Sequence, residues 1–244
     1  MKLALLIALS YFFLLFVTLS NKLPLALSDI NKYVISLGGE PVSLAEPYYI
    51  LPSTFLQNGS QGGGLILGQT MNNIYKNNST ATRTCPCPLT VLQDYHNPKF
   101  FGFPVFFTTP SSQNKSTNNN KYISTSTPLD ITFRHHKPIN CAKSLKWIVV
   151  VDHDFPYPYI GVGGGDHDQS DKKKIVNGTF HFEEFNDNND NSFYLAYYEL
   201  VFCPTSSSII GGGCKGIGRY NNGVHGNQKR LILIDKDPFQ IGLN

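Results

Sequence analysis

The residues best suited to covalent chemistry in this chain are its five cysteines, which can form disulfide bonds in an oxidising compartment. Cys87, Cys141, Cys203 and Cys214 are widely spaced, and Cys85 lies just before Cys87. Four cysteines allow three connectivities, so spacing alone leaves the pairing open. Because the number of cysteines is odd, one thiol is left over, and either Cys85 or Cys87 could be the one that pairs.

Two Asp-His-Asp triplets carry side chains that metals favour as ligands, namely Asp152-His153-Asp154 and Asp166-His167-Asp168, with His135 and His136 nearby in sequence. Adjacent residues of a strand point to opposite faces, so one triplet cannot close round an ion. A structural zinc site needs a defined tetrahedral set, and no such set is specified here. The sequence therefore predicts solvated loop charges and no metal site.

The serine, histidine and acidic residues form no recognisable catalytic pattern. No serine stands in a Gly-x-Ser-x-Gly nucleophile elbow, and His-Glu-x-x-His is missing. The triple glycines at 163–165 and 211–213 lack the Lys-Ser/Thr ending of a phosphate-binding loop, so we interpret them as turns. We expect neither an enzyme nor a cofactor.

The first 28 residues have the pattern of a secretory signal peptide. Lys2 precedes a largely apolar run from Leu3 to Val17, and Ala26-Leu27-Ser28 suits the small-x-small rule for cleavage. A membrane anchor is the alternative, but about 15 apolar residues are few against the roughly 20 that a span needs. We expect a cleaved leader at 1–28, a single domain at 29–244, and a secreted protein, extracellular or vacuolar, without a membrane segment in its mature form.

The charge balance argues against nucleic acid as a partner. The formal net charge is +3, and loss of the leader would remove Lys2 and Lys22, leaving a nearly neutral chain. Nucleic-acid binding needs a clustered basic surface. The one basic run, at 172–174, follows Asp166, Asp168 and Asp171, so we interpret it as part of a solvated loop.

Short apolar and aromatic runs separated by turn residues indicate an all-β chain. Several alternate with period two, as in Leu129-Asp130-Ile131-Thr132-Phe133 and Phe180-His181-Phe182-Glu183, which is typical of half-buried strands. The runs are at 48–51, 65–67, 89–92, 105–107, 129–133, 147–151, 179–185, 193–202, 219–220 and 230–234. Such a series predicts a sandwich or a closed barrel, and periodicity does not choose between them.

Four polar segments are expected to be exposed loops, at 108–121, 163–174, 186–191 and 205–213. The first contains Pro, Ser, Gln, Asn and Lys without any aliphatic residue. Long loops in compact domains often carry function, so this segment is the leading candidate.

Several short motifs follow one another between residues 33 and 243. They are Tyr48-Tyr49-Ile50-Leu51-Pro52, the glycines at 62–64, Cys87-Pro88-Leu89-Thr90-Val91, the Leu-x-Ile-x-Phe strand at 129–133, Cys141 with Trp147, Val201-Phe202-Cys203-Pro204, Cys214 with Ile217-Gly218, Arg230-Leu231-Ile232-Leu233 and Pro238-Phe239. In this order they closely resemble the plant Kunitz-type (soybean trypsin inhibitor) family.

The resemblance implies a β-trefoil, which is a short-stranded barrel with capping hairpins. It implies two disulfides, Cys87–Cys141 and Cys203–Cys214, and leaves Cys85 over. It also implies a secreted, monomeric inhibitor of a trypsin-like or subtilisin-like serine endopeptidase. Cys85 could then join two chains, cap a small thiol or remain buried and unreactive.

In the family, the protease meets an exposed loop between the fourth and fifth strands, which corresponds here to residues 109–125. The loop enters the protease cleft like a substrate but is held rigid by the barrel, so little conformational entropy is lost on binding. The resemblance places the contact within 109–121. The expected contact residues are Pro110, Ser111, Ser112, Gln113, Asn114, Lys115 and Ser116.

The residue that would enter the protease specificity pocket differs with the direction of counting. If the family's spacing is counted forward from the preceding strand, the position falls at Ser112. If it is counted back from Leu129, the position falls at Asn119. Trypsin-like enzymes need Lys or Arg there, which favours Lys115, the basic residue between the two. Ser112 would instead favour an elastase-like or subtilisin-like enzyme with a small pocket.

The chain departs from the family pattern beside this loop. The Asn whose amide supports the loop is replaced by Leu44, whose side chain cannot donate hydrogen bonds, and the early Asp-x-x-Gly segment reads Ser36-Leu37-Gly38-Gly39. The alternative is therefore a non-inhibitory binding, defence or storage protein with a degenerate loop. A further alternative is inhibition of cysteine proteases or a carboxypeptidase through another surface.

Five Asn-x-Ser/Thr sequons are possible glycosylation sites if the chain is secreted. They are Asn58, Asn77, Asn78, Asn114 and Asn177. We expect some of them to be used, and a glycan on Asn114 would stand beside Lys115.

Overall fold

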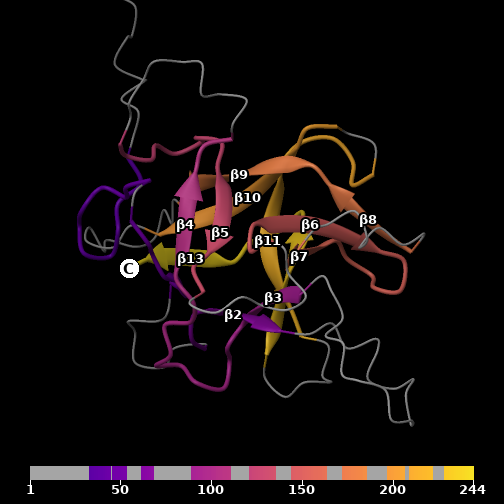
Figure 1. Ribbon diagram of the computed structural model, residues 1–244, viewed down its shortest axis with the longest axis horizontal. Coiled ribbons are helices and arrows are strands. Elements are labelled where there is room, and N and C mark those ends of the chain that lie inside the picture. Colours follow the sequence, from indigo (N-terminus) through magenta and orange to yellow (C-terminus); the bar gives the residue numbers. More distant parts are fainter. Residues whose placement is uncertain are drawn as a thin grey trace, which may run out of the picture. The chain divides into compact units, whose positions relative to one another are not determined.

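The structure is a computed structural model that describes residues 33–44, 46–53, 62–68, 89–110, 121–135, 144–163, 172–185, 197–206, 209–221 and 228–244. These ranges all belong to one unit, Tyr33–Asn244. Strands and turns make up these ranges, and within them no helix could cross a membrane. Figure 1 shows the arrangement of the strands.

The described strands are β1 (Ile50–Pro52), β2 (Leu65–Gly68), β3 (Leu89–Gln93), β4 (Val105–Thr108), β5 (Asp130–Phe133), β6 (Trp147–Asp152), β7 (Tyr159–Val162), β8 (Lys173–Val176), β9 (Gly178–Glu184), β10 (Tyr198–Pro204), β11 (Lys215–Tyr220), β12 (Lys229–Ile234) and β13 (Gln240–Leu243).

The strands form one large antiparallel sheet and a separate hairpin. The large sheet has the order β1-β13-β10-β11-β12-β3-β7-β6-β8, with β2 added on β3 and β9 on β10. The hairpin is β4–β5 (Figure 1). Isolated bridges attach it to the rest of the chain, including Tyr48 to Val105, Leu129 to Phe180 and Thr132 to Lys146. Pairing β1 with β13 brings the first and last strands together.

Period-two patterns in the sequence correspond to strands with one buried face, as predicted. In β9, Phe180 and Phe182 are buried while His181 between them is only partly buried. In β5, Ile131 and Phe133 are buried, and Leu129 just before the strand is completely buried. The alternation arises because successive side chains of a strand point to opposite faces of the sheet.

The main core combines aliphatic side chains with a group of aromatic rings, several of which meet edge to face. The ring of Trp147 lies 5.7 Å from that of Phe180, and the ring of Phe182 lies 5.3 Å from that of Phe107. Such contacts stabilise the fold in addition to the stabilisation that comes from removing these large apolar side chains from water. Leu129, Ile131 and the other buried aliphatic residues fill the space between the rings.

A second apolar group, which we call the outer cluster, consists of Val150, Tyr159 and Ile232. Each follows or precedes a main-core residue in the same strand, so the two groups lie on opposite faces of β6, β7 and β12. Phe155 and Tyr220 pack against the outer cluster. The strands therefore bury apolar side chains on both faces in this part of the sheet.

Two expectations about the charged residues near 152–174 are wrong. Lys173 and Lys174 were expected in an exposed loop but lie in β8, which is an edge strand paired with β6. Lysines are common on edge strands because their charge discourages further pairing. Asp152 was expected to be solvated but is only 6% exposed, and one of its carboxylate oxygens lies 3.6 Å from the Lys173 ammonium.

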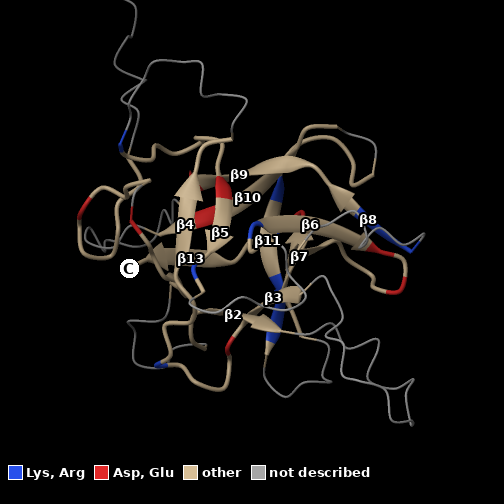
Figure 2. Ribbon diagram, viewed as in Figure 1, with Lys and Arg blue, Asp and Glu red and all other residues tan. Residues whose placement is uncertain are grey.

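Figure 2 shows the charged residues of the described strands and turns. Basic residues are distributed over several strands, with acidic residues among them (Figure 2). Among the described residues, no three His, Cys, Asp or Glu side chains are grouped closely enough to hold a metal ion.

We predict that Phe182→Ala destabilises the fold by about 3–5 kcal/mol, because it removes a fully buried ring and leaves a cavity. Urea unfolding followed by the fluorescence of the single tryptophan, Trp147, measures this change. The matched control is Phe100→Ala, whose ring is 37% exposed and whose loss should cost about 1 kcal/mol or less. Equal losses in the two variants would contradict this assignment of the core.

Candidate functional site

The candidate contact segment lies between β4 and β5, where the sequence predicts it. Of its predicted contact residues, Pro110 is described, directly after Thr108 and Thr109 at the end of β4. The structure does not describe residues 111–120, which contain Ser111, Ser112, Gln113, Asn114, Lys115, Ser116 and Asn119. The structure therefore describes the two limbs that lead into and out of this segment.

The entry limb is β4, which is paired on both sides. It pairs with β5 through residues that include Thr108 opposite Asp130. On its other side, Val105 and Tyr48 exchange two backbone hydrogen bonds of 2.9 and 2.8 Å. Val105 is completely buried, so these bonds are shielded from water. The entry limb is thus fixed by β5 and by the residues just before β1.

The exit limb, residues 121–124, is attached to residues 33–44, which we call the N-terminal segment. The Leu44 N–H donates to the Lys121 carbonyl at 3.0 Å, and the Val34 N–H donates to the Ile123 carbonyl at 2.8 Å. The Ile123 N–H donates in turn to the Val42 carbonyl at 2.9 Å. The Ile123 side chain is completely buried and anchors the limb in the core.

Leu44 holds the exit limb with its backbone. Its side chain cannot supply the hydrogen bonds of the family's Asn, as the sequence predicts, and it packs against the main core. The backbone N–H nevertheless reaches the Lys121 carbonyl. Leu44 therefore gives the exit limb a backbone tether at the place where the family resemblance predicts the loss of a side-chain support.

Two buried tyrosine hydroxyls hold the N-terminal segment itself. The Ile35 N–H donates to the Tyr198 hydroxyl at 2.7 Å, and the Ser43 N–H donates to the Tyr48 hydroxyl at 2.9 Å. Burial raises the pKa of both hydroxyls, so both stay protonated at neutral pH. The sequence analysis did not predict either contact. Tyr198 and Ile35 are 163 positions apart, so no local pattern links them.

Residues of β9 make contacts that hold the turn after the exit limb. Ser126 has a left-handed backbone with φ of 63°, which is unfavourable for a residue with a side chain. One ring nitrogen of His181 lies 2.9 Å from the Ser126 carbonyl oxygen, and the other lies 2.9 Å from the Thr179 hydroxyl. These contacts help to keep this conformation in place.

The described surface beside the exit limb is aromatic and basic. Tyr33 and Tyr122 are 44% and 38% exposed, and their rings meet edge to face at 5.8 Å. The Lys121 ammonium lies 5.4 Å from the centre of the Tyr122 ring. Tyrosine is common at protein interfaces, so this surface suits contact with another protein.

The short predicted disulfide, Cys203–Cys214, is confirmed and joins the end of β10 to the residue before β11. The long pair, Cys87 and Cys141, and Cys85 fall in parts of the chain that the structure does not describe.

Among the predicted glycosylation sites, Asn177 is described and is exposed in the turn between β8 and β9. Its carbonyl oxygen accepts a hydrogen bond from the Thr205 N–H at 2.9 Å. Asn58, Asn77, Asn78 and Asn114 are not among the described residues.

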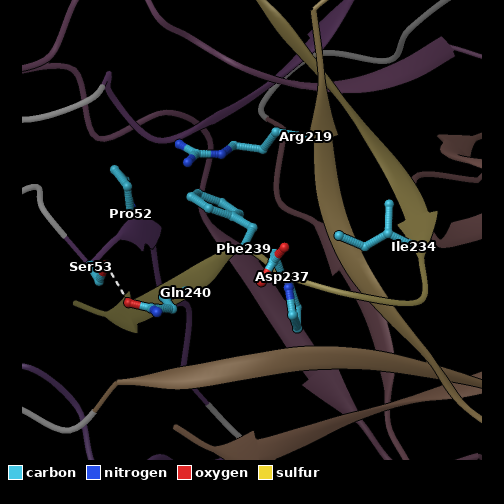
Figure 3. Close-up of a pocket in the computed structure, with 8 residues that line it drawn as sticks. Pro52, Ser53, Arg219, Ile234, Asp237, Phe239 and Gln240 are labelled. Carbon is cyan, nitrogen blue, oxygen red and sulfur yellow. Dashed lines mark hydrogen bonds between the residues drawn. The ribbon is translucent and has the colours of Figure 1, made fainter. Parts of the chain in front are cut away.

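A separate cavity of about 360 Å³ lies among residues of β1, β11, β12 and β13 (Figure 3). The Arg219 guanidinium lies 4.4 Å from the centre of the Phe239 ring and donates to Gln93 at 3.1 Å. Ser53 and Gln240 are hydrogen-bonded to each other on another wall (Figure 3). None of the predicted contact residues is among the described residues that line it.

Comparison with known proteins relates the whole described region to protease inhibitors. The sequence model of the legume Kunitz family, described as trypsin and protease inhibitor, matches residues 34–244. The subtilisin inhibitor CLSI-II of Canavalia lineata is 34% identical, over 85% of this chain and 89% of that protein. The Kunitz-type trypsin inhibitor-like 2 protein of Pisum sativum is 33% identical, over 94% of this chain and 88% of that protein.

A solved structure confirms the predicted β-trefoil. The Kunitz type trypsin inhibitor from Cicer arietinum superimposes with a TM-score of 0.62 at 32% identity. The match covers 87% of this chain and 97% of that one.

We predict that Tyr198→Phe loosens the N-terminal segment, because the Ile35 N–H loses its acceptor inside the protein. The expected cost is about 1–3 kcal/mol. Amide hydrogen exchange should become faster at Val34 and Ile123 and stay unchanged in β11 and β12. Tyr33→Phe is the control, since that side chain is 44% exposed. Unchanged exchange at Val34 and Ile123 would show that the Tyr198 hydroxyl does not hold the segment.

Proposed function

Because the chain belongs to the legume Kunitz family of trypsin and protease inhibitors, we propose that it inhibits a serine endopeptidase. Residues 109–121 would occupy the active site of the protease in the manner of a substrate. The protein itself would catalyse nothing and would need no cofactor. The observation that carries the proposal is the double attachment of the segment, with β4 fixed at its entry and residues 121–124 fixed at its exit.

The attachment matters because binding of a flexible segment costs conformational entropy. Limbs that are already hydrogen-bonded lose little freedom on binding, so more of the contact energy appears as affinity. The same attachment would keep the two ends in place after a peptide bond is cut, so that the bond can re-form. An inhibitor needs this property, whereas a substrate is released once it has been cut.

The relatives support either of two protease classes. One is named a subtilisin inhibitor and another a trypsin inhibitor-like protein. Lys115 in the specificity pocket would favour a trypsin-like enzyme, whereas Ser112 would favour an enzyme with a small pocket. The same proposal includes a cleaved leader at residues 1–28, secretion, a monomeric state and partial glycosylation.

The test is titration of the purified protein against trypsin, chymotrypsin, elastase and subtilisin. We expect tight, stoichiometric inhibition of at least one enzyme. If trypsin is inhibited, Lys115→Ala should weaken binding by about 2–4 kcal/mol, as for other central interface residues. Lys99→Ala is the matched control, because Lys99 is an exposed lysine on a different turn and should have no effect.

Failure to inhibit any of the four enzymes, with progressive digestion between 111 and 121, would contradict the proposal. It would favour the alternative, a non-inhibitory binding, defence or storage protein of the same fold. Inhibition of subtilisin that Lys115→Ala leaves unchanged would keep the proposal and would move the specificity position to Ser112 or Asn119.

A further inference from the structure

Arg230 lies within a group of four aromatic rings on the face of the sheet that carries the outer cluster. Phe155 and Tyr157 come from the turn between β6 and β7, Tyr159 begins β7, and Tyr220 ends β11. The Phe155 ring is central, with ring centres 5.7 Å from Tyr159 and 5.3 Å from Tyr220. Arg230 is the cross-strand partner of Tyr220. We call these five residues the aromatic–arginine cluster.

The guanidinium of Arg230 is close to two of these rings. Its central carbon lies 4.2 Å from the centre of the Phe155 ring and 5.0 Å from the centre of the Tyr159 ring. Arg230 is only 8% exposed. Aromatic rings attract a cation, but they do not accept the hydrogen bonds that its five N–H groups can donate.

The described residues provide no carboxylate that pairs with Arg230. Asp152 is close enough to influence its charge, but it pairs with Lys173 at 3.6 Å and accepts a hydrogen bond from the Asp154 N–H at 3.0 Å. The Arg230 Nε and the hydroxyl of the completely buried Tyr159 have no hydrogen-bond partner. Burial lowers the pKa of Arg230, and the nearby Asp152 carboxylate acts in the opposite direction.

A buried cation without a directly paired anion is costly, and buried polar groups without partners are rare in native proteins. Such an arrangement is expected where a ligand supplies the missing charge. A planar carboxylate fits the guanidinium, since its two oxygens match two N–H groups in one plane.

The exposed rings of the cluster indicate which chemical group the ligand carries besides its carboxylate. Tyr157 is 41% exposed, and its ring lies 5.3 Å from that of the half-buried Tyr220. Exposed aromatic rings favour stacking on another flat ring. We propose that the aromatic–arginine cluster binds a small aromatic carboxylate, with the carboxylate on Arg230 and the ring against Tyr157 and Tyr220. This site is distinct from residues 109–121, and the inference does not depend on protease inhibition.

The test uses benzoate as the probe and isothermal titration calorimetry on the full protein, with acetate and benzyl alcohol for comparison. We expect benzoate to bind more tightly than acetate, which lacks the ring, and than benzyl alcohol, which lacks the charge. Arg230→Lys keeps the charge but loses the planar fork, so it should weaken binding at least about tenfold. Tyr157→Ala should also weaken binding, and its exposed position makes loss of folding an inadequate explanation.

The matched control is Arg134→Lys, because Arg134 also lies over a ring, that of Phe106 at 5.6 Å, but is exposed. It should leave benzoate binding unchanged. The absence of benzoate binding at millimolar concentrations would overturn the proposal. So would binding that Arg230→Lys and Tyr157→Ala both leave intact, since the probe would then be bound elsewhere.

Discussion

The structure depends most on the attachment of the N-terminal segment to the middle of the chain. Val34 and Val42 both hydrogen-bond to the backbone of Ile123, and the Leu37 N–H donates to the Leu243 carbonyl at 2.6 Å. One short segment therefore joins the exit limb of the candidate site to the last strand. Since Ile123 and Leu243 are completely buried, water competes poorly for these bonds. The same contacts stabilise the fold and position the site.

The second constraint is that some strands bury residues on both faces. In β12, Leu231 and Leu233 belong to the main core, whereas Ile232 belongs to the outer cluster and Arg230 lies among the aromatic rings. A trefoil of this kind can carry two independent surfaces. One is the segment between β4 and β5, and the other is the face that carries the outer cluster.

The sequence predicts most strands, because alternation such as that of Phe180 and Phe182 is a local signal. The predicted runs omit β7 and β13. They also omit β8, where Lys173 and Lys174 have the composition of a loop and are strand residues because β6 pairs with them. The sequence cannot predict that Asp152 is buried and pairs with Lys173, which lies in another strand. The Tyr198 hydroxyl bond to Ile35 is equally non-local. The contact residues at 111–116 remain predictions from the family resemblance.

The central claim is that both limbs of the segment stay fixed when it meets a protease. Prolonged incubation with a catalytic amount of the inhibited protease, followed by mass spectrometry, tests it most directly. We expect one cut between residues 109 and 121 and a constant ratio of cut to intact protein, reached from either starting form. Continued digestion to small fragments, with no return of the intact form, would contradict it.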